Sequence, residues 1–491
     1  MQLTESRFNN FRCFKEYPIK YGIHTTVFIG KNGSGKSSIL SGIRRGLSFM
    51  FAKPKNFPKN LAVSNNAMVK SFGKLEANFD PLSRSYSYPI KNDFIGNFNS
   101  EPIQWSLVKK TMNGGLTTTL YSETLNKVLN YYNNNLIAEL PVLAVFADSF
   151  PHEKINFGQK VRKIIGQDIL PRDLGYYGWD EKTNCIELWL SRFFKVSNFE
   201  KDLNDEIRAI QSQISLWEGK FKDAEDNDDS KLNSIHASIF KLNERLRYLH
   251  SDERSNRFNI ERLFIENKLI EFTKPISDEY NFINKEFELN RVAVNRPDKE
   301  NFTIELSFKD GRVIAFETLP MGYKRIFSIV IDLAYRCYIL NENIDSNGIV
   351  LIDEIELHLH PTLQQEILQR LQKTFPKIQF IATTHSLLVI SNFKADANNK
   401  IIKLEHDGNS YSNEDVENVF GLDYSTNLSE IMEVAPRSST IDKYINAYLI
   451  LLGKKKETEA DLMLQKLKDY LGGEIPNLLQ KEIDNQKKAY L

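Results

Sequence analysis

Short, continuous apolar runs along the chain are typical of strands buried in a parallel sheet. Four of them lie at residues 25–29, 141–147, 348–352 and 378–383. Between residues 302 and 405 such strands alternate with helical patterns, as they do in an α/β sheet with parallel strands. Residues 51–140 are polar, aromatic and Asn-rich, and they predict short strands and loops. The predicted fold class is therefore α/β, with a mixed or mainly parallel sheet.

A helical period dominates residues 199–250. Apolar residues recur there at three- and four-residue steps in two halves: Phe199, Leu203, Ile207, Ile210, Ile214, Trp217 and Phe221, then Leu232, Ile235, Ile239, Leu242, Leu246 and Leu249. The polar turn 225–230 separates the halves. This pattern predicts an inserted antiparallel coiled-coil hairpin, with arms of about three heptads that reach on the order of 35 Å. A further helix is predicted from Asn259 to Lys274, and the tail from Asp415 is predicted to be helical.

These patterns divide the chain into four predicted regions. An N-terminal lobe covers residues 1–195, and the helical hairpin insert covers 196–290. A C-terminal lobe at 291–410 completes the α/β part, and a helical C-terminal region follows at 411–491. The insert thus separates two lobes that are expected to share one sheet.

A glycine-rich loop follows the first buried strand. It reads Gly-Lys-Asn-Gly-Ser-Gly-Lys-Ser from Gly30, which matches the P-loop pattern G-x-x-x-x-G-K-[ST]. Glycines let backbone N–H groups approach phosphate oxygens, and the helix that begins near Lys36 points its positive end at the same phosphates. Lys36 is expected to reach the β- and γ-phosphates of ATP, and Ser37 to bind Mg²⁺. The predicted nucleotide-binding residues are Gly30, Lys31, Asn32, Gly33, Ser34, Gly35, Lys36, Ser37 and Ser38.

The strand at 348–352 ends in two carboxylates, an ending typical of a Walker B element. Asp353 is expected to hold Mg²⁺ together with Ser37, and Glu354 to orient or deprotonate the attacking water. His385 follows the next strand, where a histidine can sense the γ-phosphate and hold that water. The predicted catalytic residues are therefore Glu354, His385 and Lys36.

Together these motifs resemble the ABC-type ATPase heads of the SMC, RecF and OLD-like group. In that group the Walker motifs lie far apart in sequence with a coiled coil between them, as Lys36 and Asp353 do here. Residues 319–325 open an apolar helix before the Walker B strand and resemble the ABC signature loop. The resemblance implies an SMC-like P-loop head that binds ATP and Mg²⁺ between two protomers. The signature-like residues, expected to contact the other protomer's nucleotide, are Gly322, Tyr323 and Lys324.

A narrower resemblance is to the PtuA-type ATPases of Septu and retron antiphage systems. It is carried by the start at 10–14, the P-loop, the hairpin, the Asp-Glu-Ile-Glu-Leu-His-Leu-His-Pro stretch at 353–361, and residues 431–437. It implies an ATPase that controls an effector nuclease of the HNH type. A retron version adds a reverse transcriptase and its multicopy single-stranded DNA.

Two departures refine this expectation. Pro320 and Met321 replace the usual Ser and first Gly of the signature, which removes a hydroxyl contact to phosphate and predicts slow turnover or a stable dimer. The segment after His385 contains neither the Asp-x-Asp pair of a Toprim nuclease nor a His-Asn-His pattern. Nuclease activity is therefore expected from a partner and not from this chain.

Composition narrows the class of protein. Lys and Arg number 64 and Asp and Glu also number 64, so the net charge is zero, which argues against bulk coating of nucleic acid. No apolar stretch reaches the length of a spanning helix, and the start lacks a signal region, so no membrane segment is expected. The three cysteines are far apart, which fits a reducing cytoplasm.

The sequence leaves several alternatives open. The chain is also compatible with a RecF-like repair ATPase that binds DNA itself, with a nucleotide-gated scaffold that hydrolyses little ATP, and, more distantly, with a transporter subunit. One basic group is either a solvated face or a nucleic-acid contact: Arg44, Arg45, Lys53, Lys55 and Lys59. Another group either packs within its loop or against a subunit, or holds a metal: Glu356, His358 and His360.

Overall fold

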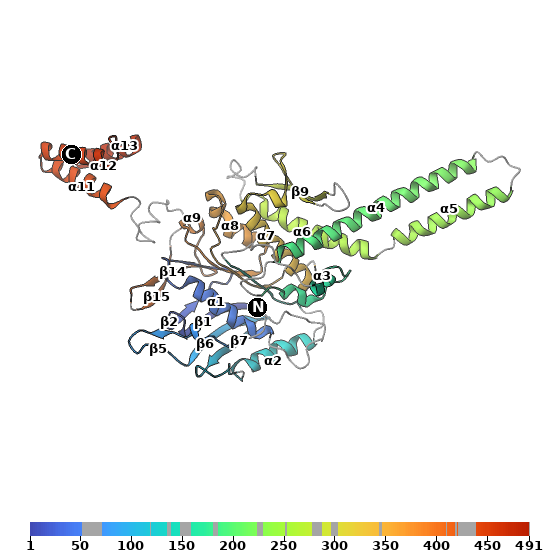
Figure 1. Ribbon diagram of the computed structural model, residues 1–491, viewed down its shortest axis with the longest axis horizontal. Helices are drawn as coiled ribbons and strands as arrows, with labels where there is room; N and C mark the ends of the chain where they lie inside the picture. The colour runs from blue at the N-terminus through green and yellow to red at the C-terminus, as the bar shows by residue number, and fades with distance from the viewer. Residues whose placement is uncertain are drawn as a thin grey trace. The chain divides into compact units, whose positions relative to one another are not determined.

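The computed structural model (Figure 1) describes residues 1–51, 71–117, 119–134, 139–147, 159–179, 185–222, 229–250, 253–276, 287–295, 303–342, 346–408, 410–417, 420 and 438–490. The chain divides into two compact units, Met1–Phe420 and Gly421–Leu491. All the sheets and the long helical hairpin belong to the first unit, and three helices make up the described part of the second.

A six-stranded sheet organises the first unit. Its strands are, in spatial order, β15 (Tyr411–Asp415), β14 (Asn399–His406), β3 (Thr25–Ile29), β13 (Ile378–Thr383), β12 (Gly348–Ile352) and β8 (Val142–Phe146). The last five are mutually parallel, and β15 pairs antiparallel with β14. The four strands predicted from continuous apolar runs are all present, and β3, β12 and β13 are buried throughout. The α/β fold class is therefore confirmed.

A four-stranded antiparallel sheet lies beside the P-loop helix in the N-terminal part. It has the order β2 (Phe14–Lys20), β1 (Gln2–Phe11), β6 (Ile90–Phe98) and β7 (Glu101–Lys109), and helix α2 (Thr119–Asn134) follows β7. The prediction of only short strands and loops for 51–140 was wrong in this part. Alternate positions of β6 face the core, but Asn92 and Gly96 occupy two of them, so the apolar alternation is broken.

The remaining strands are short. β4 (Phe79–Asp80) pairs with β5 (Ser85–Tyr86), and β9 (Leu289–Asn295), β10 (Thr303–Phe308) and β11 (Val313–Ala315) form a three-stranded antiparallel sheet. The shorter helices of this unit are α1 (Lys36–Leu47), α3 (Gln159–Ile165), α8 (Pro361–Thr374) and α9 (Leu387–Ser391). Two longer ones are α6 (Glu253–Thr273), which begins earlier than predicted, and the largely buried α7 (Met321–Asn341). Within the described residues, we find no helix with the length and apolarity needed to cross a membrane.

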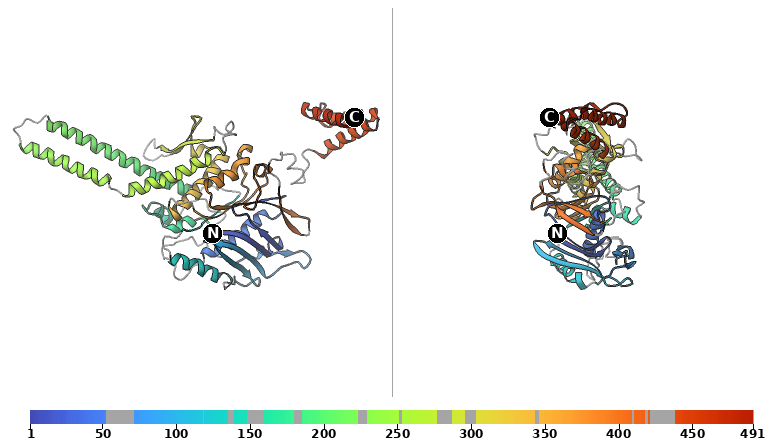
Figure 2. Two further views of the ribbon diagram at one scale, coloured as in Figure 1. Left: turned by 180° about the vertical axis from the view of Figure 1, so that it is seen from behind. Right: turned by 90° about the vertical axis from the view of Figure 1, so that its left-hand side faces the viewer.

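The predicted antiparallel hairpin is confirmed. Helices α4 (Ile186–Lys222) and α5 (Asp229–His250) run side by side (Figures 1 and 2). Their seam buries Leu203, Ile210 and Leu249, which belong to the predicted periodic set. An ion pair between Arg245 and Glu206, at 2.9 Å, joins the two arms.

The first helix of the hairpin starts earlier than its periodic pattern indicated. Residues 186–198 of α4 are packed inside the head, where the indole N–H of Trp189 donates to Asp332 of α7 at 2.7 Å. The guanidinium of Arg192 binds both carboxylate oxygens of Glu261 on α6, each at 2.8 Å, and both side chains are almost fully buried. Because this part is buried on more than one side, its sequence lacks the single apolar stripe that is typical of a hairpin arm. The hairpin is thereby anchored to α6 and α7.

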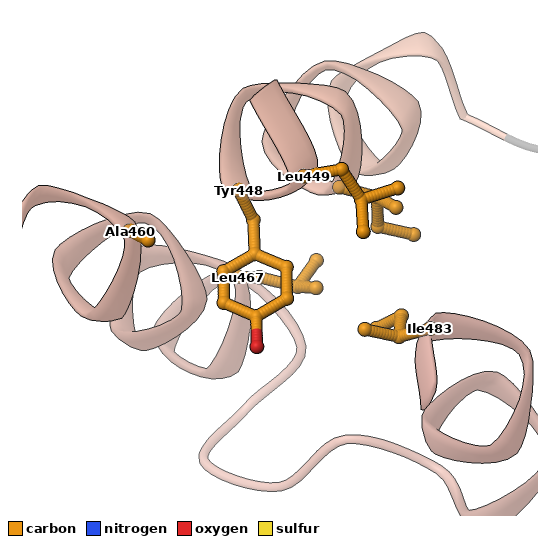
Figure 3. Packing of buried hydrophobic residues seen from close by; sticks show 6 residues of the cluster. Tyr448, Leu449, Ala460, Leu467 and Ile483 are labelled. Carbon is orange, nitrogen blue, oxygen red and sulfur yellow. The ribbon is translucent and has the colours of Figure 1, made fainter. Parts of the chain in front are cut away.

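The second unit is a small three-helix assembly. It comprises α11 (Ser439–Gly453), α12 (Glu457–Tyr470) and α13 (Asn477–Tyr490). Figure 3 shows its core, to which all three helices contribute: Ile445, Tyr448, Leu449, Ala460, Leu467 and Ile483. The predicted helical tail is confirmed for α11, α12 and α13, but its predicted start was wrong: Tyr411–Asp415 forms strand β15, which pairs with β14 at the edge of the central sheet. Residues 421–437 of the predicted tail lie outside the described residues.

Candidate active site

The P-loop lies between β3 and α1, as the sequence predicts. Gly30, Gly33 and Gly35 have positive φ angles of 147°, 83° and 97°, which strongly favour glycine at these positions. A Cβ atom on Gly30 would lie 2.4 Å from the carbonyl oxygen of Leu404, so that position also has no room for a side chain. Around Gly33, in contrast, no atom lies within 4 Å of a Cβ position. The loop therefore presents backbone to open space, as a phosphate cradle requires.

The other residues of the loop differ in exposure. Lys31, Asn32 and Ser37 are exposed, whereas Ser34 and Lys36 are buried. The ammonium of Lys36 donates to the carbonyl oxygens of Gly30, at 2.7 Å, and of Lys31, at 3.0 Å. These two bonds hold the lysine folded back over the loop that is predicted to carry the phosphates.

Burial also changes the acid–base behaviour of Lys36. Loss of hydration lowers its pKa from 10.5 to about 8, although the charges of Asp353, Glu354 and Glu356 act in the opposite direction. These charges act on Lys36 because the P-loop strand β3 and the Walker B strand β12 end at the same edge of the sheet. The sheet thus brings Lys36 of one lobe to the carboxylates of the other.

The two carboxylates after β12 are held by backbone bonds and by a neighbouring strand. The Thr383 hydroxyl, at the end of β13, donates to the Asp353 carboxylate and accepts the backbone N–H of Glu354 at 2.9 Å. The buried guanidinium of Arg325 donates to the carbonyl oxygens of Asp353, at 2.9 Å, and of Glu354, at 3.1 Å. Glu354 has a φ of 47°, an unusual value for a residue with a side chain. These hydrogen bonds therefore hold the Glu354 backbone in a left-handed conformation that is unfavourable for a residue with a side chain.

His385 lies beside Glu354, at the end of the strand between the P-loop and Walker B strands. Its Nε2 atom is 4.0 Å from Oε1 of Glu354, and both side chains are about one-third exposed. The backbone N–H of His385 donates to Oε1 of Glu356 at 2.6 Å, and Oε2 of Glu356 is buried with no hydrogen-bond partner among the described residues. A water molecule beside the pair can hydrogen-bond to both the imidazole and the carboxylate at such a distance, which suits general base chemistry.

The donor set suits Mg²⁺. Ser37 exposes a hydroxyl at the first turn of α1, and Asp353 supplies a carboxylate at the end of β12. Oxygen ligands of this kind are those Mg²⁺ prefers, with the remaining positions left to water and phosphate. Ser37 and Asp353 therefore remain the predicted ligands of the ion.

The signature-like residues occupy the first turn of α7. A Cβ atom on Gly322 would lie 2.2 Å from the carbonyl oxygen of His358, so α7 packs directly on the loop after the Walker B strand. The Tyr323 ring contacts the rings of Phe287 and Phe327 of the same chain, at centroid distances of 5.0 and 6.2 Å. Lys324 is half-buried beside it. Packing within the chain is thus sufficient to require glycine at 322, and the contact of these residues with a second protomer stays a prediction.

This packing makes Gly322→Ala a sharp test of the loop. We expect the variant to lose about 1–3 kcal/mol of unfolding free energy, because the clashing atom is backbone and cannot rotate away. Thermal unfolding measures the loss. The matched control is Gly219→Ala in α4, where a Cβ meets no atom within 4 Å; it should gain up to about 1 kcal/mol from helix propensity. Equal stability of Gly322→Ala and wild type would contradict the close packing.

The structure shows the contacts of the two residue groups whose roles the sequence left open, the possible metal ligands and the basic residues. Among the described residues, no group of three or more His, Cys, Asp and Glu side chains could hold a metal ion. His360 contacts the Thr362 hydroxyl at 3.0 Å, and His358 is exposed with a φ of 64°. Arg45, from the basic group, pairs with Glu76. Lys53, Lys55 and Lys59 lie outside the described residues.

Sequence reasoning missed several residues that shape the site. Thr383 and Arg325 fix the Walker B backbone, and neither was among the predicted site residues, although Arg325 ends the signature-like segment 319–325. Burial raises the pKa of the Cys13 thiol, while hydrogen bonds with the side chains of Ser38 and Tyr411 oppose that rise. Thr383 ends a predicted buried strand, which was the one available signal, since strand ends of a parallel sheet form its binding edge.

Comparison with known proteins decides the family. The profile of the family described as AAA ATPase domain matches residues 1–390. The chain belongs to this family. It therefore carries an ATPase domain, and the match covers the P-loop, the hairpin, both Walker B carboxylates and His385.

Its relatives include probable ATPases named for retrons and a protein named for Septu. The chain is 28% identical over 404 residues to the Retron Vc95 probable ATPase of Vibrio cholerae serotype O1 biovar El Tor, which covers 78% of this chain and 70% of that protein. It is 23% identical over 527 residues to the Retron Ec83 probable ATPase of Escherichia coli, covering 100% and 88%. Septu protein PtuA of Bacillus mycoides (strain KBAB4) is 38% identical over 115 residues, 23% of this chain and 16% of that one. The resemblance to PtuA-type ATPases is confirmed.

Among solved structures, the chain is similar to the Smc head domain of Pyrococcus furiosus, crystallised with an extended coiled coil and bound to the C-terminal domain of ScpA. The identity is 15% and the TM-score 0.43, with 85% of this chain and 96% of that chain covered. At these values the likeness says nothing about activity.

Proposed function

We propose that this chain is the ATPase subunit of a bacterial antiphage defence system, in which it binds and hydrolyses ATP and so controls a partner nuclease of the HNH type. One observation carries the proposal: a P-loop lysine, two Walker B carboxylates and a histidine meet at one edge of a parallel sheet. The chain's membership of the AAA ATPase domain family supports the same reading.

Each residue of the site has a distinct role in the proposed reaction. The P-loop backbone binds the phosphates, and Lys36 supplies positive charge to the β- and γ-phosphate oxygens. Glu354 orients the attacking water and accepts its proton, while His385, 4.0 Å away, holds the same water near the γ-phosphate. Mg²⁺, held by Ser37 and Asp353, neutralises charge on the phosphates when bound. Thr383 and Arg325 keep the two carboxylates in place.

The proposed partners follow from the relatives and from the resemblance. Relatives named for retrons and for Septu support a defence role, and the cytoplasm is the proposed location. A second copy of the chain is the first partner, with ATP between the two heads and Gly322, Tyr323 and Lys324 facing the other copy's nucleotide. The nuclease is a separate subunit. A reverse transcriptase and its multicopy single-stranded DNA join the assembly where the system is a retron.

A pull-down from the native host tests this assignment. The tagged full chain should bring down an HNH nuclease in the presence of ATP and Mg²⁺, and Lys36→Ala should abolish protection in a phage challenge. Lys456→Ala, which changes an exposed lysine of the second unit, is the matched control and should protect like wild type. A chain recovered alone, or with chromosomal DNA only, would contradict the defence assignment and favour the RecF-like repair ATPase.

A further inference from the structure

A pair of aromatic rings lies on the side of the P-loop strand that faces away from the catalytic carboxylates. In the central sheet, β3 has β13 on one side and β14 on the other. Glu354 and His385 follow β12 and β13, whereas His406 ends β14. Parallel strands end at the same edge of a sheet. A nucleotide on the P-loop with its γ-phosphate near Glu354 therefore extends its nucleoside toward β14.

Two aromatic rings form a preformed surface on the β14 side of the P-loop. His406 and Tyr411 stand at the turn between β14 and β15, with ring centroids 4.2 Å apart and planes inclined by 31°. His406 is exposed and Tyr411 is half-buried, so the pair is accessible to a ligand. Aromatic rings in such a position stack readily on the π-face of a nucleobase.

The ring pair is connected to the P-loop through Phe14, whose ring meets the Tyr411 ring. A Cβ atom on Gly35 of the P-loop would lie 2.6 Å from Cζ of the same Phe14 ring. A Cβ atom on Gly35 would lie 3.2 Å from Cys13 Sγ, and one on Gly30 would lie 2.4 Å from the Leu404 carbonyl of β14. The rings and the phosphate cradle are thus neighbours within one packed region.

The strand β15, which carries Tyr411, is also held by hydrogen bonds to β2. The hydroxyl of Tyr17 on β2 donates to the Ser412 carbonyl at 2.8 Å, and the Asn413 side chain donates to the Pro18 carbonyl at 3.0 Å. The Phe14 ring meets the Tyr411 ring edge-on at 5.5 Å. Figure 1 shows β14 and β15 beside β2 and α1. A surface held on several sides binds a planar ligand without first having to become ordered.

We infer that the rings of His406 and Tyr411 form the base-binding subsite, on which the purine ring of the nucleotide stacks. This rests on the proposed function and adds to it the residues that recognise the nucleoside. Tyr411 contributes most, because Phe14 packs against both its ring and the P-loop glycine Gly35, and His406 extends the stacking surface.

The test compares a ligand that has a base with one that lacks it. Calorimetry of the full chain measures the Kd for ADP and for inorganic pyrophosphate, neither of which requires turnover. Tyr411→Ala should weaken ADP binding about tenfold or more and leave pyrophosphate binding within about twofold of wild type, because only stacking is lost. Tyr411→Phe keeps the ring and should bind ADP like wild type. The matched control is Tyr248→Ala, an exposed tyrosine of the hairpin helix α5.

Three results would overturn the inference. Equal weakening of ADP and pyrophosphate in Tyr411→Ala would mean that the tyrosine only shapes the P-loop. Unchanged ADP binding in Tyr411→Ala would place the base elsewhere and leave the proposed ATPase function standing. If wild type bound neither ADP nor ATP, the proposed function and the subsite would both fall.

Discussion

Glu354→Gln should reduce the steady-state rate of ATP hydrolysis by about 10² or more, with ATP binding retained. The substitution keeps the size of the side chain and removes its ability to accept a proton. Glu354 ends the Walker B strand, 4.0 Å from His385, and Thr383 and Arg325 hold its backbone, so the amide should take the same position as the carboxylate. Phosphate release from ATP by purified wild type and variant measures the effect.

Glu459→Gln provides the control for this substitution. Glu459 lies in α12 of the second unit, where it pairs with Lys456 at 2.8 Å and is about half exposed. The same chemical change there should leave the hydrolysis rate at the wild-type value. Hydrolysis by Glu354→Gln at the rate of the control would exclude Glu354 as the catalytic base.

Lys36→Ala should raise the Kd for ATP by about 10- to 100-fold and abolish measurable turnover. The lysine is the one P-loop side chain whose buried charge lies near the carboxylates, and hydrogen bonds from a charged donor to phosphate are among the stronger ones. Calorimetry with ATP measures binding. Lys456→Ala is the matched control, and a thermal melt checks that Lys36→Ala remains folded.

The pH dependence of ATP binding gives a second readout for Lys36. In the free protein, burial lowers the pKa of this lysine to about 8. Bound phosphates favour the charged form and raise the pKa, so binding takes up a proton wherever the free lysine is neutral. Affinity for ATP should therefore be level below pH 8 and fall by up to about tenfold per pH unit above it. A pH profile of wild type that matches that of Lys36→Ala would contradict this role.

Much of the fold could be predicted because its signals are local. Buried parallel strands give continuous apolar runs, and the arms of a coiled coil give a stripe of apolar residues, so 348–352, 378–383 and the seam of the hairpin were readable. The P-loop and the Walker B carboxylates were equally plain, because each motif is contiguous in the sequence.

The features that could not be predicted depend on contacts between distant parts of the chain. The strand β6 was hidden because Asn92 and Gly96 fill core-facing positions, and the start of α4 because it is buried on more than one side. The partner strand of a residue is equally invisible in the sequence. Tyr411 of β15 meets Phe14 only because β15 pairs with β14 and β14 with β3, and Arg325 reaches Glu354 only through the packing of α7.

A single-turnover experiment decides whether this chain hydrolyses the ATP that it binds. The purified full chain, in excess over radiolabelled ATP and with Mg²⁺ present, is sampled over time for ATP and ADP. We expect wild type to convert the bound ATP to ADP and phosphate, and Glu354→Gln to hold the same ATP unhydrolysed over that period. Wild-type protein that binds ATP but leaves it intact would contradict the account and identify the chain as a nucleotide-gated scaffold.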